Sequence, residues 1–590
     1  MTISLCMIVK NEEAMLAHCL DSVQDVVDEI IIVDTGSTDH TVEIAERYDA
    51  RIYVYPWDGS FSNARNYAMK LAVMDWILII DADNVFEKQD KDKLRSLTSA
   101  DAKATAYYCK TLSFLGEAPD AGSVICNLNI CLVRNHMGYR FTGSIHEQIY
   151  CSDPAAKAVT AISDMRIYHY GYLNSAIRTQ SKRERNISMI QKELDKRPDD
   201  PFMLYNLGNE FYAQLKIKEA YECYLKSYAH FAPDAGFSPR LLLRLVVCCE
   251  AVGDTAQQLC FIDEGLKIYP LYTDLEFIRG SVWLKKERYL AAIQSFKKCL
   301  EMGEPPILLG YLTDVGTVKP AQMLCQIYHN LGDPKNALRY VKIALDFQPF
   351  SHEVCAQLSA LLIEKMPPEA AAKKLSRLLP AESQKYLLIS DVFYSHHRYD
   401  VALDYTRKAL RHGCDPTLAK YNQGICLFYL KRYQDACARF KSLAGSAYES
   451  RASFLSRLCV MFDSNVDQNL PRGDEPYFSV LERFETLMAD KSCAPLAADE
   501  QSSIPYIAPI MSLLDILIKS ERLEEFEKAR RLLNLIKDDS VLMRLGKLYF
   551  RNGYLKPAYR ELERSIKLTG KTDGEALRMM KYILDSRTLI

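Results

Sequence analysis

Two aspartates separated by one residue follow a buried apolar segment of the chain. Residues 76–80 read Trp-Ile-Leu-Ile-Ile, a run typical of a strand covered on both faces, and Asp81-Ala82-Asp83 comes directly after it. Carboxylates at positions i and i+2 of an extended chain project to the same side, where their like charges repel. A hard divalent cation relieves this repulsion, because it prefers carboxylate oxygens. The spacing therefore favours a metal site at the end of a strand; solvated loop carboxylates are the alternative.

Three other polar groups follow apolar segments nearer the N-terminus. They come after residues 3–9, 29–33 and 51–55, and their candidate members are Lys10, Asn11 and Glu12, then Asp34 and Ser37, then Asp58 and Arg65. Asp34 can accept a hydrogen bond from a base N–H or a ribose hydroxyl, and the planar fork of Arg65 can bind a base carbonyl or a phosphate. A turn residue at Asp34 and a surface ion pair at Arg65 are the structural alternatives.

Strand and helix patterns alternate up to about residue 170. The predicted strands are 3–9, 29–33, 51–55, 76–80, 104–113, 124–134 and 160–169, and the predicted helices between the first four are 12–24, 38–48 and 62–74. This order predicts an α/β fold with a mostly parallel sheet covered on both faces. Because ligands of such sheets bind at the carboxyl ends of the strands, the polar groups would meet where a nucleotide can bind.

From about residue 200 the pattern changes to pairs of helices. Small and large residues match the tetratricopeptide template at Leu204, Leu207, Gly208, Phe211, Ala220 and Tyr224, and the same offsets recur as far as residue 562. These repeats predict an all-α superhelix. We expect an α/β domain over 1–200, a repeat array over 201–460 and a C-terminal helical region over 461–590, with irregular stretches at 303–320, 463–475 and 491–507.

Composition indicates an ordinary globular protein. The 590 residues are 48% hydrophobic and 25% charged, with a net charge of -2, which gives no reason to expect nucleic acid as a partner. We expect no transmembrane segment and no signal peptide. The 18 cysteines are scattered without a C-x-x-C pair, so we expect buried free thiols in a reducing cytoplasm.

Four stretches of the N-terminal part carry a family resemblance. The segments "MIVKNEE", "IIIVDTGSTDHT", "PWDGSFSNARN" and "WILIIDADN" resemble family 2 glycosyltransferases of GT-A fold, in which the Asp81–Asp83 motif is the DXD motif. "GSIHEQI" at 143–149, "YHYGY" at 168–172 and the trailing repeats resemble a bacterial subgroup with sublancin-type peptide S-glycosyltransferases. The resemblance implies that Asp34 and Arg65 hold the uracil of a UDP-sugar. It also implies that Asp81 and Asp83 hold the ribose and the metal-bound diphosphate, with Mg²⁺ or Mn²⁺ as cofactor.

Inverting transfer needs a base that takes the proton of the acceptor. We prefer Glu147 by analogy with acidic bases of the family, with His146 as the alternative; the usual acidic pair is absent here. The resemblance also suggests His169 as a third metal ligand, against a histidine of purely structural role. Arg183 or Arg185 could reach the diphosphate, and a solvated basic helix face is the alternative.

Three functional hypotheses follow. The first is a cytoplasmic glycosyltransferase that modifies a peptide or protein held by the repeats, which could also mediate homo-oligomer formation. The second is a glycosyltransferase of cell-surface polysaccharide synthesis. The third is a non-catalytic repeat scaffold with a decayed transferase domain, and the intact Asp34, Arg65, Asp81 and Asp83 argue against it.

Overall fold

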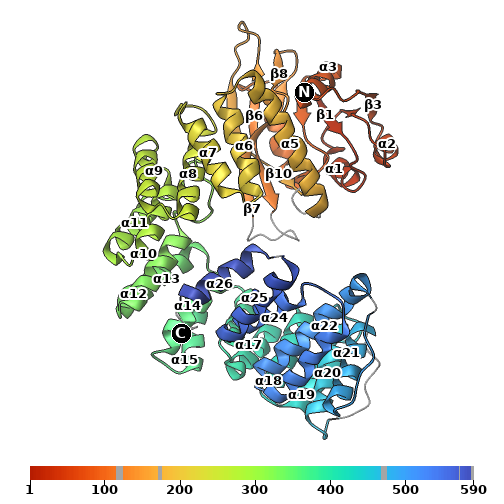
Figure 1. Cartoon of the computed structure of the whole chain (residues 1–590), viewed down its shortest axis with the longest axis vertical. Helices are drawn as coiled ribbons and strands as arrows, with labels where there is room; N and C mark the ends of the chain where they lie inside the picture. The colour runs from red at the N-terminus through yellow and green to blue at the C-terminus, as the bar shows by residue number, and fades with distance from the viewer. Residues whose placement is uncertain (115–123, 171–175, 467–474, 498, 571, 586–590) are drawn as a thin grey trace. The chain divides into compact units, whose positions relative to one another are not determined.

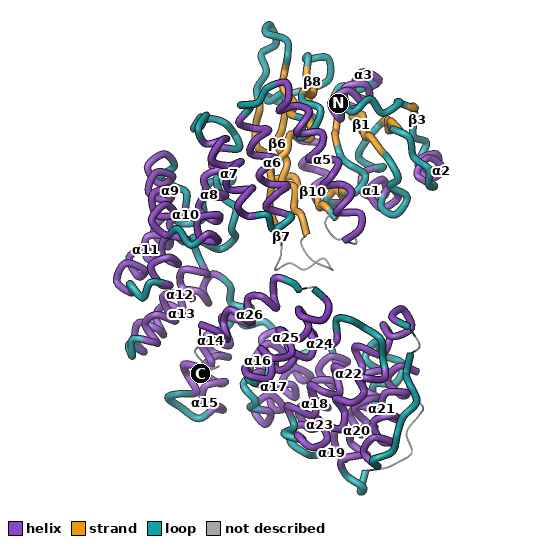
Figure 2. Tube along the Cα trace, viewed as in Figure 1, coloured by secondary structure: helices purple, strands orange, loops and turns teal. Residues whose placement is uncertain are grey.

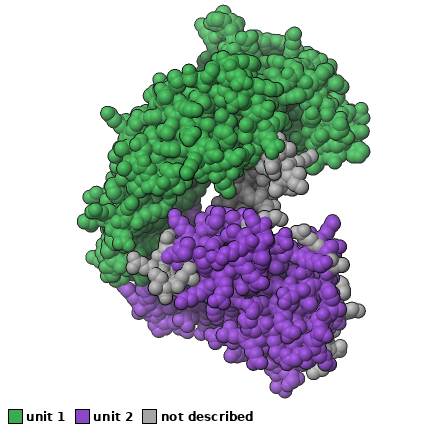
Figure 3. All heavy atoms as spheres, in the orientation of Figure 1, with its two compact units in different colours: residues 1–340 green, residues 341–590 purple. Residues whose placement is uncertain are grey.

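The chain forms two compact units, residues 1–340 and 341–590 (Figure 3). The computed structural model describes residues 1–114, 124–170, 176–466, 475–497, 499–570 and 572–585. All strands of the described chain precede residue 170, and the later described elements are helices (Figures 1 and 2). The predicted fold class is confirmed: an α/β domain precedes a long all-helical repeat region. The predicted domain limits at 200 and 460 stay a prediction.

The strands form one large sheet and one small one. They are β1 (Ile3–Val9), β2 (Glu29–Asp34), β3 (Arg51–Val54), β4 (Trp76–Ile79), β5 (Asn84–Phe86), β6 (Ala106–Phe114), β7 (Val124–Arg134), β8 (Tyr139–Thr142), β9 (Gln148–Cys151) and β10 (Thr160–His169). The large sheet has the order β3-β2-β1-β4-β7-β6-β10-β5, and β8 pairs with β9. Strands β1 to β4 are mutually parallel, whereas β7 runs antiparallel to both β4 and β6.

The pairing brings distant segments to one edge of the sheet. Val9 pairs with Asp34, so β1 and β2 end level with each other, next to the end of β4. β10 is parallel to β6 and antiparallel to β5, and His169 pairs with Asn84. The carboxyl end of β10 therefore lies beside the residues that follow β4, although some 85 residues separate them in the sequence.

The first unit contains the helices that cover the sheet and the first repeats. They are α1 (Leu16–Val23), α2 (Thr41–Glu46), α3 (Phe61–Leu71), α4 (Lys91–Leu97), α5 (Ala176–Lys196), α6 (Pro201–Ala213), α7 (Ile217–Tyr228), α8 (Ser238–Val252), α9 (Thr255–Ile268), α10 (Thr273–Lys285), α11 (Tyr289–Met302) and α12 (Val318–Asn330), with a 3₁₀ turn η1 (Lys88–Asp90). The division between the two units falls within α13 (Pro334–Phe347). Alternate residues of β1 enter different cores: Leu5 and Met7 pack in one cluster and Cys6 in another. The strand is thus buried on both faces, as its apolar run predicts.

The second unit contains the later helices. They are α14 (His352–Ile363), α15 (Pro368–Leu378), α16 (Gln384–Ser395), α17 (Tyr399–Arg411), α18 (Pro416–Tyr429), α19 (Tyr433–Lys441), α20 (Glu449–Phe462), α21 (Glu475–Met488), α22 (Glu500–Lys519), α23 (Leu523–Arg530), α24 (Val541–Arg551), α25 (Leu555–Thr569) and α26 (Gly574–Asp585), with a 3₁₀ turn η3 (Arg531–Leu535). The repeat glycines explain the pairing of helices. A Cβ atom at Gly208 would lie 2.5 Å from the Tyr224 ring, and one at Gly424 would lie 2.4 Å from the Phe440 ring. Only glycine admits the large partner there, as the template predicts.

Two sequence expectations need correction. Cys109 and Cys131, on neighbouring strands β6 and β7, form a disulfide with Cα atoms 6.1 Å apart, and strand pairing of this kind leaves no local sequence signal. The stretch 491–507 is helical from residue 500, and α22 contains Pro505. Residues 501–519 of α22 are also long and apolar enough to cross a membrane by length and composition, which is weak evidence because buried core helices meet the same criteria.

Candidate active site

Arg65 joins two carboxylates at the carboxyl edge of the sheet. It lies on α3, whose start is capped by Ser60, and its side chain is 14% exposed. Its Nη2 donates to Asp81 Oδ1 at 2.8 Å and its Nε donates to Glu147 Oε1 at 2.6 Å. Burial alone would lower the pKa of Arg65, but Asp81 and Glu147 together raise it. The guanidinium thus links the DXD motif to the candidate base.

Asp83 and His169 lie together on the other side of the motif. Asp83 Oδ2 is 3.3 Å from His169 Nε2, with both side chains about one-fifth exposed. The Tyr170 N–H donates to the Asp83 carbonyl at 3.0 Å, which ties the end of β10 to the motif. Asp81 Oδ1 faces Arg65 instead, and among the described residues no group of three or more His, Cys, Asp or Glu side chains is arranged to hold a metal ion.

Two loops after β1 and β2 are fastened to each other. The Asp34 carboxylate accepts hydrogen bonds from the backbone N–H groups of Gly36 and Ser37, so it shapes its own turn. The Asn11 N–H donates to Ser37 Oγ at 3.0 Å, and Asn11 Oδ1 accepts from the Thr38 N–H at 2.7 Å. Asp34 therefore has the turn-forming role that was one of the two alternatives. A contact with a nucleotide base would be a second role.

The other predicted residues of the nucleotide site lie around this edge. Lys10 is exposed and Ala82 is buried. The Glu12 N–H donates to Thr41 Oγ1 at 2.8 Å. Asp58 accepts from Tyr55 Oη and Asn63 Nδ2 at the start of α3, which fixes the turn before the helix.

The segment with the candidate base is held from two sides. The Phe61 N–H donates to the Ser144 carbonyl at 2.9 Å, and Ser144 Oγ donates to Glu193 of α5 at 3.0 Å. Ile145 is 3% exposed and packs in a cluster with Leu204 and other residues of α5, α6 and α7. The segment with the candidate base thus contacts the first repeat, which sequence patterns within 1–170 do not reveal.

His146 precedes Glu147 and is partly buried. It has a positive φ of 51°, and its Nε2 atom is buried without a hydrogen-bond partner among the described residues. Burial lowers the pKa of His146, while Glu210 and Glu147 act in the opposite direction. Glu210 of α6 accepts from Arg183 Nη1 at 3.2 Å and from Asn186 Nδ2 at 2.8 Å. Glu210 and Asn186 are thus supporting residues that the motifs missed.

Arg185 lies in a different place from Arg183. Its guanidinium carbon is 5.3 Å from the centre of the Phe61 ring, and burial lowers the pKa of Arg185. Together with Asp58, Asn63 and Ser144 it lines a cavity of about 790 Å³ between α5 and the start of α3. The structure therefore groups Arg65, Asp81 and Glu147, pairs Asp83 with His169, and places Arg185 in the neighbouring cavity.

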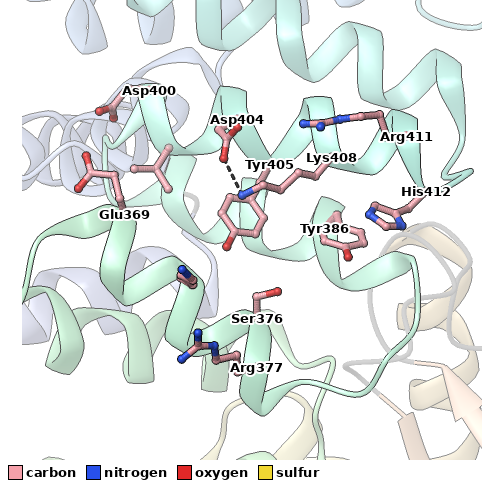
Figure 4. Close-up of a pocket in the computed structure, with 12 residues that line it drawn as sticks. Glu369, Ser376, Arg377, Tyr386, Asp400, Asp404, Tyr405, Lys408, Arg411 and His412 are labelled. Atoms are coloured by element: carbon pink, nitrogen blue, oxygen red, sulfur yellow. Dashed lines mark ion pairs between the residues drawn. The ribbon is translucent and has the colours of Figure 1, made fainter.

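A separate cavity of about 680 Å³ lies in the second unit, between α15, α16 and α17 (Figure 4). Glu369 and Asp400 lie at one end of it, and Arg411 and His412 lie at the other. No residue of the predicted transferase site lines this cavity.

Sequence comparisons find a family match within the N-terminal domain. Residues 4–119 match the family model described as "Glycosyl transferase family 2". Over 259 residues the chain is 32% identical to a TPR repeat-containing protein of Synechococcus elongatus, covering 43% of this chain and 62% of that protein. Over 291 residues it is 28% identical to the SPbeta prophage-derived glycosyltransferase SunS of Bacillus subtilis, covering 48% of this chain and 67% of that protein.

A solved structure is also similar to this chain. It is a crystal structure of a tetratricopeptide repeat protein from Parabacteroides merdae, which is 16% identical and covers 42% of this chain and 94% of that chain, with a TM-score of 0.27. The chain spans about three fifths of the length of the Synechococcus protein.

Proposed function

We propose that this chain, which carries a family 2 glycosyltransferase domain followed by a tetratricopeptide-like helical region, is a metal-dependent, inverting glycosyltransferase. It takes the sugar from a nucleotide-sugar, a UDP-sugar by resemblance, and transfers it to a peptide or protein held by the repeats. Of the relatives, the SunS protein is named a glycosyltransferase and the Synechococcus protein a repeat protein. The cytoplasm remains the proposed location.

One observation carries this proposal: Arg65 joins Asp81 to Glu147 at the sheet edge where Asp83 meets His169. Breaking a sugar–phosphate bond needs positive charge near the departing diphosphate and a proton acceptor near the incoming group. The edge offers both kinds of group within one connected cluster. Arg65, Asp81 and Asp83 also lie within the segment that matches the family.

The donor set suits a hard divalent cation. Asp83 and His169 are adjacent. Carboxylate oxygens together with an imidazole nitrogen suit Mn²⁺, whereas Mg²⁺ binds chiefly to carboxylates. We assign Asp83, Asp81 and His169 to the cation. When bound, the cation acts as a Lewis acid on the diphosphate. Asp81 Oδ1 accepts from Arg65, so Oδ2 would be the oxygen available to the cation.

We assign the proton transfer to Glu147. Arg65 binds Glu147 Oε1, so Oε2 is the oxygen that takes the proton of the acceptor. The same guanidinium keeps the carboxylate oriented toward the DXD motif. His146 is the alternative base, but its Nε2 atom is buried, whereas Glu147 shares Arg65 with Asp81. Arg185, which lines the neighbouring cavity, is assigned to the diphosphate.

A donor panel tests the proposed function. We expect the full chain with Mn²⁺ to release nucleotide from one nucleotide-sugar of the panel, and Glu147→Gln to slow transfer to an acceptor by about 10²-fold or more. Asp92→Asn, an exposed position on α4, is the control and should retain activity. Absence of release with every donor would favour the scaffold hypothesis. A sugar found on polysaccharide precursors and never on peptide would favour the second transferase hypothesis.

A further inference from the structure

A long connection between two repeat helices folds back onto earlier repeats. Residues 303–317, which we call the insert, join α11 to α12, whereas the other connections between consecutive helices from α8 to α14 have only a few residues. Leu309 and Tyr311 of the insert pack against the core of α6 to α10, beside Tyr205 and Tyr212. The insert therefore occupies a surface made by other repeats of the first unit.

A buried carboxylate binds the backbone of the insert. Asp274, the second residue of α10, is 0% exposed, and its Oδ1 accepts from the N–H groups of Tyr311 at 3.0 Å and Leu312 at 2.6 Å. Burial raises the pKa of Asp274, while the two N–H donors and Arg240 act in the opposite direction. A carboxylate that accepts two successive backbone N–H groups recognises main chain whatever the side chains.

Two arginines of α8 bind the tip of the insert. Arg240 Nη2 donates to the Gly310 carbonyl at 2.6 Å, and its guanidinium carbon is 4.8 Å from the centre of the Tyr311 ring. Arg244 lies 5.6 Å from the same ring and 4.8 Å from the Tyr212 ring. An aromatic ring near two guanidinium groups gains cation–π energy as well as burial. Tyr311 is thus the anchor of the insert.

The insert leaves part of this surface unsatisfied. Arg240 Nη1 and Asp274 Oδ2 are buried without a hydrogen-bond partner among the described residues, and such atoms normally have one. The base of the insert is fastened separately, because Glu304 Oε1 accepts from the Gly316 N–H and from Thr317 Oγ1. The tip can therefore leave its place without releasing the ends.

We propose that the surface formed by α6, α8 and α10 around Asp274, Arg240 and Arg244 is a binding site for an extended peptide with an aromatic residue, and that the insert is its displaceable internal occupant. First helices of successive pairs form one continuous surface in such arrays. The ligand replaces Tyr311 with its own aromatic ring and places two consecutive N–H groups on Asp274. The proposal specifies where a peptide acceptor would bind. Only the identity of the natural ligand as an acceptor rests on the proposed function.

The insert is tethered to the chain, and this sets the affinity expected for a free peptide. A segment on a short linker competes at an effective concentration of about millimolar, so a free peptide must overcome that competition. The wild-type chain should therefore bind a free copy of the insert at least about tenfold more weakly than a chain whose insert cannot compete.

The test measures peptide binding without any sugar donor, so its result is independent of catalysis. The probe is a fluorescent peptide with the sequence of residues 304–314, and the protein is the full chain with residues 307–312 replaced by glycine and serine. We expect binding by anisotropy, and at least about tenfold weaker binding when alanine replaces the tyrosine of the peptide or when the protein also carries Arg240→Met. Glu276→Gln, a buried acid of α10 that pairs with Lys298, is the control and should bind like its parent.

Two results would overturn the proposal. One is a folded insert-replaced chain, by circular dichroism and thermal unfolding, that does not bind the peptide. The other is equal binding of the tyrosine and alanine peptides, which would reduce the insert to a structural connection.

Discussion

Arg65 binds two carboxylates of the candidate active site, those of Asp81 and Glu147. Its two partners differ in environment, since the Asp81 side chain is 47% exposed and that of Glu147 is 13% exposed. A buried carboxylate that loses its guanidinium partner is destabilised, because its desolvation is no longer offset by an ion pair. Arg65 is therefore a stability determinant of the first unit as well as a candidate ligand-binding residue.

Replacing Arg65 should destabilise the first unit. We expect Arg65→Leu to lower its free energy of unfolding by about 3 kcal/mol, because Glu147 is left buried and unpaired. All three tryptophans, Trp57, Trp76 and Trp283, lie in this unit, so tryptophan fluorescence in urea reports on it alone. Arg95→Leu, at an exposed position of α4, should change stability by less than about 0.5 kcal/mol. Equal effects of the two substitutions would contradict a buried ion-pair network.

His146 should make stability depend on pH. Burial holds its pKa below the ordinary 6.5, against the attraction of Glu210 and Glu147. The unfolded chain therefore binds the proton more readily, so this stabilisation is present above pH 6.5 and is lost as the pH falls through the folded-state pKa. His146→Gln should flatten the loss of stability between neutral and mildly acidic pH.

His136→Gln is the matched control for that measurement. His136 also has a positive φ, of 59°, but its side chain is exposed. It should leave the slope of stability against pH unchanged. Identical slopes for both variants and the wild type would contradict the contribution of His146.

Local sequence patterns predicted individual strands and helices, but they did not predict which strands pair. The apolar runs of β1, β2 and β4 identify buried strands, because both faces of each strand are covered. The neighbourhood of Asp83 and His169 depends on β10 lying beside β5 and β6, and such non-local pairing is not encoded in any window of sequence. The disulfide between Cys109 and Cys131 was missed for the same reason.

The first repeat should be needed for the catalytic segment to fold. Ile145 packs with residues of α5, α6 and α7, and each such buried side chain contributes about 1.5–3 kcal/mol. A chain ending at residue 199 would expose this apolar surface, whereas one ending at residue 235 would keep it covered. We expect the shorter chain to aggregate and the longer one to be monomeric by light scattering. A soluble shorter chain of equal stability would contradict this coupling.

In the whole molecule, the sequence constrains the α/β domain more closely than it constrains the ligand of the repeats. The contact of Arg65 with Asp81 could be anticipated from motifs, because both residues follow parallel strands of the sheet. The repeats predict a superhelix without naming its ligand, since fold alone does not determine function. The contact of the insert with Asp274 joins segments that only the folded chain brings together.

We propose that the edge formed by Asp81, Asp83, His169 and Arg65 binds a metal-bound nucleotide diphosphate. Calorimetric titration of UDP into the full chain, with and without Mn²⁺, measures this binding. We predict that Mn²⁺ strengthens UDP binding at least about tenfold and that Asp83→Asn removes this gain, because a metal-bridged diphosphate needs the carboxylate. Asp92→Asn should behave like the wild type. Equal UDP binding with and without Mn²⁺, or an unchanged gain in Asp83→Asn, would contradict the assignment.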